Sequence, residues 1–290
     1  MNQIIYVFIK LRNFFFIFIL LLTSHACSNK KPNSVGEIKS NDKEGIVSLT
    51  SLTSDIIFAM NPESLIGIPG SSILKKNDNL KNIPIISEGR NPPNIEKIIS
   101  LNPKLVIGSD GFHDKTLSKL AELEIGILKT KVNSLSELTN LINEISEITN
   151  SDSKIVFNKL SACFIDPSPK NKKVVVLVST KPLLSPNNKS WAGSLLEKFN
   201  LKNLAADLEG SGRMKGYLNL SPEWLVKEDP DNLILIRFGN EQYNQYDSLP
   251  IWNDLKAVQK NNIDYFDYYG LINAGSLNSI NNTCKKLNSL

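Results

Sequence analysis

Short apolar runs alternate with segments of helical spacing over most of this chain. Runs such as "GIVSLT", "KLVIGS" and "IGILKT" are followed, past the middle of the chain, by "KVVVLVS" and "NLILIRF". The segments between them, among them "NIEKIISL" and "KTLSKLAEL", have the apolar spacing of amphipathic helices. This alternation is typical of βαβ units built on a parallel sheet. The sequence therefore predicts an α/β fold.

The alternation is interrupted near the middle of the chain. "SLSELTNLINEISEIT" has apolar residues at 135, 138, 141, 142, 145 and 148, the spacing of one helical face. "KIVFNKLSACFI" follows as a further helix, and then the alternation resumes. We therefore expect an N-terminal α/β lobe at 45–133, a helical connector at 134–168 and a C-terminal α/β lobe at 169–290. We also expect Ser54 to cap the helix "SDIIFAMN", because its hydroxyl can accept a free backbone N–H.

The first 26 residues have the order of a secretory signal peptide. Lys10 and Arg12 precede an apolar stretch at 14–22, and small or polar residues lead to Cys27. A cysteine at this place is similar to a bacterial lipobox, in which the cysteine becomes the lipidated first residue. An uncleaved membrane anchor is the alternative. Residues 27–44 are polar and aperiodic, as in a flexible tether. A lipid anchor and an uncleaved membrane anchor would both hold the folded body at the cell envelope, outside the cytoplasm.

The composition argues against several classes of protein. Without Lys10 and Arg12, the 33 basic residues become 31, against 29 acidic ones, which is no footprint of a nucleic-acid binder. Beyond the leader and Cys27, the residues with the strongest affinity for metals are His113, Cys163 and Cys284, too few for a bare metal site. The two cysteines can form a disulfide or remain two buried thiols.

The motifs of common enzymes are missing from the sequence. It has no G-x-S-x-G, no P-loop and no dinucleotide fingerprint. We therefore expect no enzyme, no catalytic residue, no cofactor and no metal held directly by protein side chains. A chelatase-like enzyme and a structural lipoprotein remain the alternatives from other classes.

One pattern occurs twice in the chain. "EKIISLNP" begins at Glu96 and "EWLVKEDP" begins at Glu223, and each is followed at once by an apolar run. Each copy predicts a short helix, a stop at an Asn-Pro or Asp-Pro pair, and a strand.

Several segments together resemble a known family. "GIVSLTSLTSDIIFAM", "GRNPPNIEKIISLNPKLVIGSDG", "SWAGSLLEKFNLKNLAAD", "LSPEWLVKEDPDNLILI" and "LKAVQKNNIDYFD" are similar to segments of the periplasmic binding proteins for ferric siderophores, cobalamin and haem. The resemblance implies two α/β lobes with parallel central sheets, joined by a single connecting helix, here expected at 151–165. It implies a ligand cleft between the lobes and a role as the monomeric, solute-binding component of an ABC importer.

The resemblance also implies candidate residues. Arg90 corresponds to an arginine that contacts the ligand in hydroxamate-siderophore binders, and its fork of donors suits anionic oxygens. A surface arginine pairing with Glu88 is the alternative. Phe112 falls where some siderophore binders present a tyrosine. Further candidates lie on loops at predicted strand ends, where ligands collect in open α/β sheets: Trp191, Arg237, Tyr243, Tyr246 and, with less support, Tyr268 and Tyr269.

The expected ligand is an iron chelate, with a ferric siderophore favoured because siderophore binders use arginines such as Arg90 and Arg237. Cobalamin, haem and direct binding of ferric ion by the tyrosines remain open. In the family, one carboxylate from each lobe pairs with arginines of the permease dimer. The matching positions here are Glu96 and Glu223.

Overall fold

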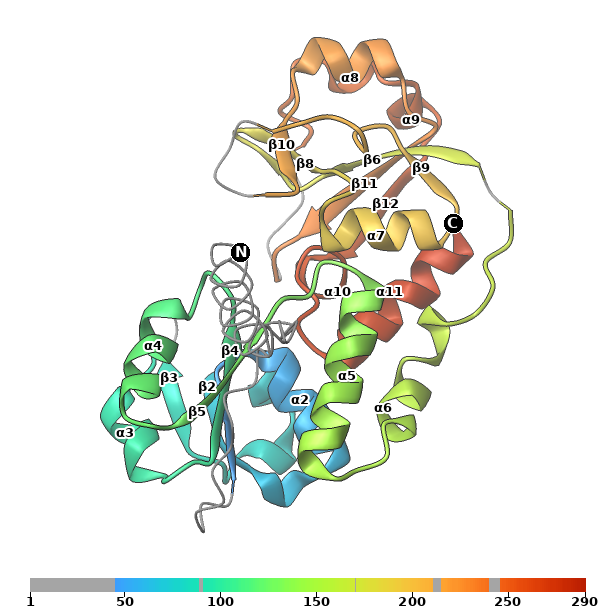
Figure 1. The fold of residues 1–290 in the computed structure, drawn as a ribbon. Coiled ribbons are helices and arrows are strands. Elements are labelled where there is room, and N and C mark those ends of the chain that lie inside the picture. Colours follow the sequence, from blue (N-terminus) through green and yellow to red (C-terminus); the bar gives the residue numbers. More distant parts are fainter. Residues whose placement is uncertain (1–44, 89–90, 170, 211–214, 240–245) are drawn as a thin grey trace, which may run out of the picture. The chain divides into compact units, whose positions relative to one another are not determined.

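The computed structural model describes residues 45–88, 91–169, 171–210, 215–239 and 246–290 (Figure 1). The predictions for the leader, the tether, Cys27, Arg90 and Tyr243 lie outside these ranges. Within them, no helix combines the length and the apolar composition needed to cross a membrane.

The first lobe is built on a parallel sheet of five strands in the order β3-β2-β1-β4-β5. Its strands are rich in buried branched apolar residues, as expected for a sheet covered on both faces. The strands are β1 (Ile46–Ser48), β2 (Leu65–Gly70), β3 (Ile85–Glu88), β4 (Leu105–Ser109) and β5 (Gly126–Thr130). The helical segments between them are α2 (Ser51–Met60), η1 (Pro62–Ser64), η2 (Leu74–Lys76), η3 (Asp78–Leu80), α3 (Ile95–Ser100) and α4 (Asp114–Glu122). This arrangement confirms the α/β alternation predicted for this part of the chain.

The second lobe contains a parallel sheet of four strands in the order β12-β11-β6-β9. Its strands are β6 (Lys172–Leu177), β9 (Leu201–Asn203), β11 (Asn232–Arg237) and β12 (Ile263–Asp267). The helical segments around it are α7 (Trp191–Lys198), α8 (Pro222–Glu228), η5 (Trp252–Asp254), α9 (Lys256–Gln259), α10 (Tyr268–Leu271) and α11 (Leu277–Ser289). The fold is therefore two α/β lobes with parallel central sheets.

A small antiparallel sheet accompanies the second lobe, and the sequence did not predict it. Its strands, in the order β10-β8-β7, are β7 (Ser179–Thr180), β8 (Leu183–Pro186) and β10 (Tyr217–Asn219). Strands of two to four residues are too short to show a period along the sequence.

The residues between the lobes form two helices and a turn. The predicted amphipathic helix is confirmed as α5 (Leu135–Thr149), which buries Leu138, Leu141, Ile142 and Ile145 on one face. The helix expected at 151–165 is wrong in its limits. The chain there forms only α6 (Lys154–Lys159) and the single turn η4 (Ser161–Cys163).

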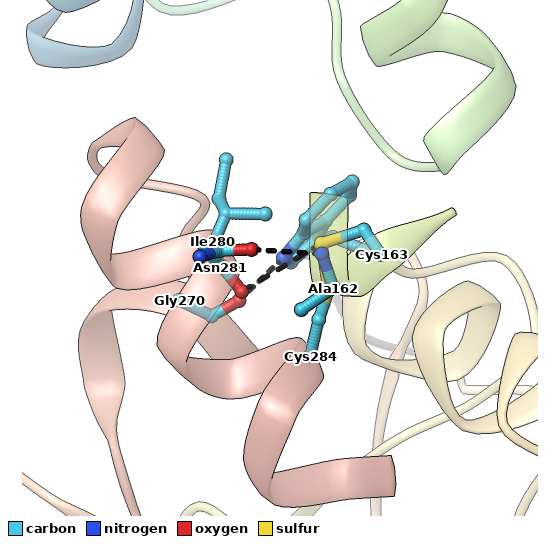
Figure 2. Close-up of a disulfide and its surroundings, with 7 residues drawn as sticks. Ala162, Cys163, Gly270, Ile280, Asn281 and Cys284 are labelled. Carbon is cyan, nitrogen blue, oxygen red and sulfur yellow. Dashed lines mark hydrogen bonds between the residues drawn. A yellow bond between two sulfur atoms is a disulfide. The ribbon is translucent and has the colours of Figure 1, made fainter. Parts of the chain in front are cut away.

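The last helix, α11, is fastened to this connecting segment. It packs against α6, η4 and α2, and a disulfide joins Cys163 in η4 to Cys284 in α11 (Figure 2). Beside the disulfide, the Ala162 backbone N–H donates to Asn281 Oδ1 at 3.1 Å. The choice left open by the sequence is therefore settled in favour of the disulfide.

One continuous cluster of buried apolar side chains connects both lobes. It includes Ile46 of β1, Leu138 of α5, Val174 of β6 and Ile280 of α11. The connector and α11 are thus part of the same hydrophobic core as the two sheets.

The predicted cap of α2 is wrong by one helical turn. The N-cap is Thr50, whose hydroxyl accepts the Thr53 backbone N–H at 3.2 Å. Ser54 lies inside the helix, and its hydroxyl donates to the Thr50 carbonyl at 2.8 Å. The helix starts earlier than expected because the polar run "TSLTS" offers several hydroxyls that can serve as the cap.

Candidate ligand-binding site

The larger of two neighbouring cavities lies at the carboxyl ends of the first sheet. This main cavity has a volume of about 1080 Å³. Every strand of that sheet contributes a residue from its carboxyl end or from the loop that follows: Thr50, Gly70, Ser87, Ser109 and Thr130. The second lobe contributes the start of α7, Tyr217 and the segment 269–275. Carboxyl ends of parallel strands are where open α/β sheets bind ligands.

The second cavity lies at the carboxyl ends of two strands of the second sheet. This side cavity has a volume of about 880 Å³ and is lined by Arg237 at the end of β11, by Phe238 after it and by Asp267 at the end of β12. Residues between 72 and 80 of the first lobe and polar residues of α11 complete it. Ser72 and Tyr269 line both cavities, so the two are neighbours.

The two cavities differ in charge. Lys75, Lys115 and Lys215 line the main cavity, and none of its described lining residues is acidic. No ion pair between described residues involves these three lysines. The side cavity has cationic side chains too, but Asp55 and Asp267 stand among them. An anionic ligand is therefore favoured by the main cavity.

The loop after β4 presents Phe112 to the main cavity. The Phe112 side chain is 85% exposed, unusually high for a phenyl ring. His113 fixes this loop, because its Nδ1 accepts the Ser109 backbone N–H at 2.9 Å and its ring meets Phe112 edge to face. Burial lowers the pKa of His113, which favours the neutral ring that can accept this bond. His113 thus positions Phe112.

Trp191 lines the main cavity from the second lobe. It is the first residue of α7, next to the N-cap Ser190, and only 3% of it is exposed. Its Nε1–H donates to the Gly270 carbonyl at 2.8 Å. The indole donor is therefore used within the protein, and Trp191 is a largely buried part of the cavity wall. The structure brings Phe112 and Trp191 to one cavity.

Tyr217 contributes a second aromatic wall that the sequence analysis missed. Its hydroxyl donates to the Ile272 carbonyl at 3.2 Å. Burial raises the pKa of Tyr217 far above its ordinary value, so the phenol stays neutral.

Arg237 lies in the side cavity and not in the main cavity. Its guanidinium stacks over the Tyr265 ring, 4.8 Å from the centroid. This cation–π contact holds the guanidinium at the carboxyl end of β11.

Tyr246 lies in the core of the second lobe and lines neither cavity. It is fully buried, and its hydroxyl donates to the Leu177 carbonyl at 2.8 Å. The Ile236 backbone N–H donates to the same hydroxyl, and the Tyr246 ring stacks with Trp252. The expectation that it contacts ligand is corrected, because the hydroxyl of a buried tyrosine needs a partner, and here the backbones of β6 and β11 supply it within the core.

Both copies of the repeated pattern form the expected helix, stop and strand. Asn94 caps α3 and Ser221 caps α8, and Glu96 and Glu223 are each the second residue of their helix. Both glutamates are exposed. A hydrogen bond from its own backbone N–H, and then one from the Ser221 hydroxyl, lower the pKa of Glu223.

Each glutamate has an exposed apolar neighbour one turn further along its helix. Ile99 is 43% exposed and Val226 is 38% exposed. Residues three positions apart lie on the same helix face, so each helix presents a carboxylate beside an apolar side chain.

The sequence analysis missed the polar lining of the main cavity. A signal was present, because the apolar runs of the first lobe close with hydroxyl residues, as in "VSLT", "PGSS", "IIS", "VIGS" and "LKT". The lysines gave no comparable signal: Lys115 lies in the first turn of α4, Lys75 in the short helix η2 and Lys215 just before β10.

Within the described ranges, no group of three or more His, Cys, Asp or Glu side chains lies close enough to hold a metal ion.

Two α/β lobes with cavities at the carboxyl ends of their parallel sheets define the class: this is the fold of the periplasmic binding proteins for cobalamin, haem and iron compounds. The fold implied by the resemblance is thereby confirmed. No family model matches the chain, and no curated protein sequence matches it significantly.

Particular solved structures give the likeness its detail. A possible iron-binding (periplasmic solute-binding) protein from Staphylococcus epidermidis has a TM-score of 0.69 and 18% identity, covering 86% of this chain and 98% of its own. The periplasmic vitamin B12 binding protein BtuF of Vibrio cholerae has a TM-score of 0.62 and 18% identity, covering 85% and 95%. The periplasmic haem-binding protein RhuT from Roseiflexus has a TM-score of 0.62 and 22% identity, covering 85% and 99%. At these identities the likeness shows the fold.

Proposed function

We propose that this chain is the extracytoplasmic solute-binding component of an ABC importer and that it captures an anionic iron chelate, with a ferric siderophore as the ligand class. The observation that carries the proposal is the main cavity. Its rim has Lys75, Lys115 and Lys215 and no described acidic residue, and hydroxyl groups close the strands beneath. Many ferric siderophores carry negative charge on the oxygens around the metal, which such a lining can attract and hydrogen-bond.

The size and the aromatic walls of the main cavity support the same ligand class. Its volume of about 1080 Å³ is at the upper end of the usual range for small-molecule sites. The exposed Phe112 supplies flat apolar surface for the organic part of a chelate, and the largely buried Trp191 contributes to the wall on the other lobe. Arg90 remains a proposed contact, since the residues that follow it, Asn91 to Pro93, line the cavity.

Haem and cobalamin are the alternatives, because the structural neighbours include a vitamin B12 binding protein and a haem-binding protein. Haem iron needs an axial ligand such as histidine. His113 is buried, and its Nδ1 already accepts the Ser109 N–H. The three lysines of the main cavity would add little to the affinity for the corrin ring of cobalamin. The anionic chelate therefore makes better use of this lining.

Direct binding of ferric ion by tyrosines has less support. Phenolate is the form that ligates iron, and burial raises the pKa of both Tyr217 and Tyr268. Tyr246 is in the core. We accordingly propose binding of a ready-made chelate, without catalysis or a resident cofactor.

Delivery to a permease dimer would use the two exposed glutamates. Glu96 and Glu223 occupy equivalent places on equivalent helices of the two lobes, which suits a partner made of two like subunits. The exposed Ile99 and Val226 beside them add apolar area of the kind found in protein interfaces.

The remaining parts of the proposal come from the sequence. Residues 1–26 serve as a signal peptide, Cys27 carries the lipid anchor and 27–44 tether a monomeric body to the membrane. The body is divided at about 133 and 168 as the sequence predicts.

The proposal is tested by titrating the purified protein with a panel of ligands and following tryptophan fluorescence, because Trp191 lines the main cavity. The panel contains ferric catecholate, hydroxamate and citrate chelates, haemin, cyanocobalamin and free ferric ion. We expect a ferric chelate to bind most tightly. Tightest binding of haemin or cyanocobalamin, or no binding at all, would contradict the proposal.

The lysines are tested with the chelate that binds best. Lys115→Gln and Lys215→Gln should each weaken an anionic chelate by roughly twofold to fivefold, and added salt should reduce the difference. Lys119→Gln is the matched control, since Lys119 lies on the same helix as Lys115 but outside the cavity lining.

A further inference from the structure

Tyr269 stands at the boundary between the two cavities. Its side chain lines both and is 38% exposed. The backbone of Tyr269 is extended within α10, with φ −78° and ψ 127°. The backbone thus departs from helical geometry at Tyr269, where the main cavity meets the side cavity.

The turn that carries Tyr269 is held rigidly. Gly270 has φ +107°, and a Cβ on it would lie 2.4 Å from the Ser279 carbonyl oxygen, so only glycine fits. The Gly270 N–H donates to the Asn273 carbonyl at 2.6 Å, and its carbonyl accepts the Trp191 Nε1–H.

The ring itself is packed against a second glycine. Gly275 has φ +68°, and a Cβ there would lie 2.9 Å from Tyr269 Cδ1. The lack of a side chain at Gly275 therefore makes room for the Tyr269 ring, which is fixed in place.

From Tyr269 a row of aromatic rings continues along the side cavity. Tyr269 meets Tyr268 edge to face at 5.2 Å between centroids, and Tyr268 lies 5.0 Å from Phe238 with the planes tilted by 30°. Phe238 is 40% exposed. All three rings line the side cavity. Grouped, exposed aromatic side chains mark a binding site for an apolar or aromatic group, and this one lies next to the lysine-lined main cavity.

We propose that Tyr269 divides one binding site into two chambers and that a single ligand fills both. The charged iron-binding core of the chelate lies in the main cavity, and an aromatic arm passes Tyr269 to lie on the Phe238–Tyr268–Tyr269 row of the side cavity. This inference rests on the proposed function and names the substrate class more closely, as a chelate that carries an aryl arm.

The charges of the two chambers support this division. The main cavity attracts the anionic core through three lysines that no described acidic lining residue opposes, whereas in the side cavity Asp55 and Asp267 oppose the cations Lys76, Arg237 and Lys286. The anionic core therefore gains more from the main cavity, and an uncharged aromatic arm fits the side cavity, where charges of both signs stand beside the aromatic row.

The test uses two matched pairs of ferric chelates, one built on a tris-hydroxamate and one on a tris-catecholate. In each pair, one chelate carries a pendant benzoyl amide and the other an acetyl amide, so the charge is the same. For the core that binds, we expect the benzoyl chelate to bind about threefold to tenfold more tightly. Phe238→Ala, outside the lining of the main cavity, should remove most of this preference while leaving the affinity for the acetyl chelate within about twofold. Tyr269→Ala should also remove most of the preference, and it is judged by the ratio of the two affinities alone, because Tyr269 lines the main cavity too. Tyr269→Phe should keep the preference.

Equal affinity of the two members in the wild type overturns the two-chamber site alone, since the proposed function needs only that one core binds. An undiminished preference in both alanine variants also overturns it. If neither core binds, the proposed function and this inference fall together. The exposed position of Phe238 makes Phe238→Ala the variant that decides if Tyr269→Ala does not fold.

Discussion

The Asp55 carboxylate accepts a hydrogen bond from the Leu277 backbone N–H at 2.8 Å, although 222 positions separate the two residues. Asp55 lies in α2, the first helix of the N-terminal lobe, and Leu277 is the first residue of α11. The first backbone N–H groups of a helix have no partner within it, so Asp55 supplies one from across the fold. Burial raises the pKa of Asp55 and is the dominant influence, and the Leu277 N–H opposes it.

Removing this acceptor should loosen α11. We expect Asp55→Ala to lower the free energy of unfolding by about 1–2 kcal/mol, because a buried N–H loses its partner. Asp55→Asn keeps an acceptor oxygen and should lose clearly less. Denaturant titration of the three proteins provides the comparison, and equal stability of the alanine variant and the wild type would show that the bond contributes nothing.

The disulfide should stabilise the same helix. It closes a loop of 121 positions, so the Cys163→Ser, Cys284→Ser double variant should be about 2–4 kcal/mol less stable than the oxidised wild type. Neither cysteine lines a cavity, so ligand affinity below the unfolding transition should not change. Melting curves with and without reductant, with a thiol count, measure the effect. A reductant-insensitive melting temperature in the wild type would contradict it.

His113 should make stability depend on pH. Its pKa is lowered in the folded protein from the ordinary 6.5, so between these two values the unfolded chain binds the extra proton. The stabilisation is therefore fully present above about pH 6.5 and is lost as the pH falls through the lowered pKa. His113→Asn cannot take up this proton, so acidification from about pH 7.5 to about pH 5.5 should lower its melting temperature less than that of the wild type. Parallel pH profiles for the two proteins would remove His113 as the cause.

The two glutamates should act in docking and not in ligand binding. Glu96→Lys and Glu223→Lys should each weaken binding to the cognate permease and uptake of the chelate, and the double variant should be worse than either, while ligand affinity stays unchanged. Glu122→Lys, on the exposed side of α4, is the control for a charge change elsewhere on the surface. Uptake by the double variant at the wild-type rate would show that the glutamates only stabilise the N-terminal ends of their helices.

Periodicity predicted the longer elements because their buried faces repeat many times. α5 is the clearest case, since the apolar positions of its 15 residues match the buried face. The strands β7 and β8, of two and four residues, contain no such repeat. The segment 151–165 has helical spacing, yet its helix stops at Lys159 because α11, more than a hundred positions away, fixes the chain that follows through the disulfide. Contacts of that range leave no local signal.

The candidate site was predictable in its location and less so in its residues. Position after a strand suggested Phe112 and Trp191, and both line the main cavity, where ligand contact stays a prediction. The same rule placed Tyr246 in the site, where its buried hydroxyl bond to Leu177 excludes it. Tyr269 was given little weight, because only the folded turn at Gly270 turns its ring toward both cavities.

The part of the main cavity's lining that comes from the first lobe is distributed over the ends of five strands and the loops that follow them. Each loop can change its residues, or gain and lose a few of them, without disturbing the pairing of the sheet beneath. Ligand preference in such a protein can therefore diverge one loop at a time, with every intermediate still folded. A library that varies the residues after β2, β4 and β5 separately should yield new specificities without a search for compensating changes in the core.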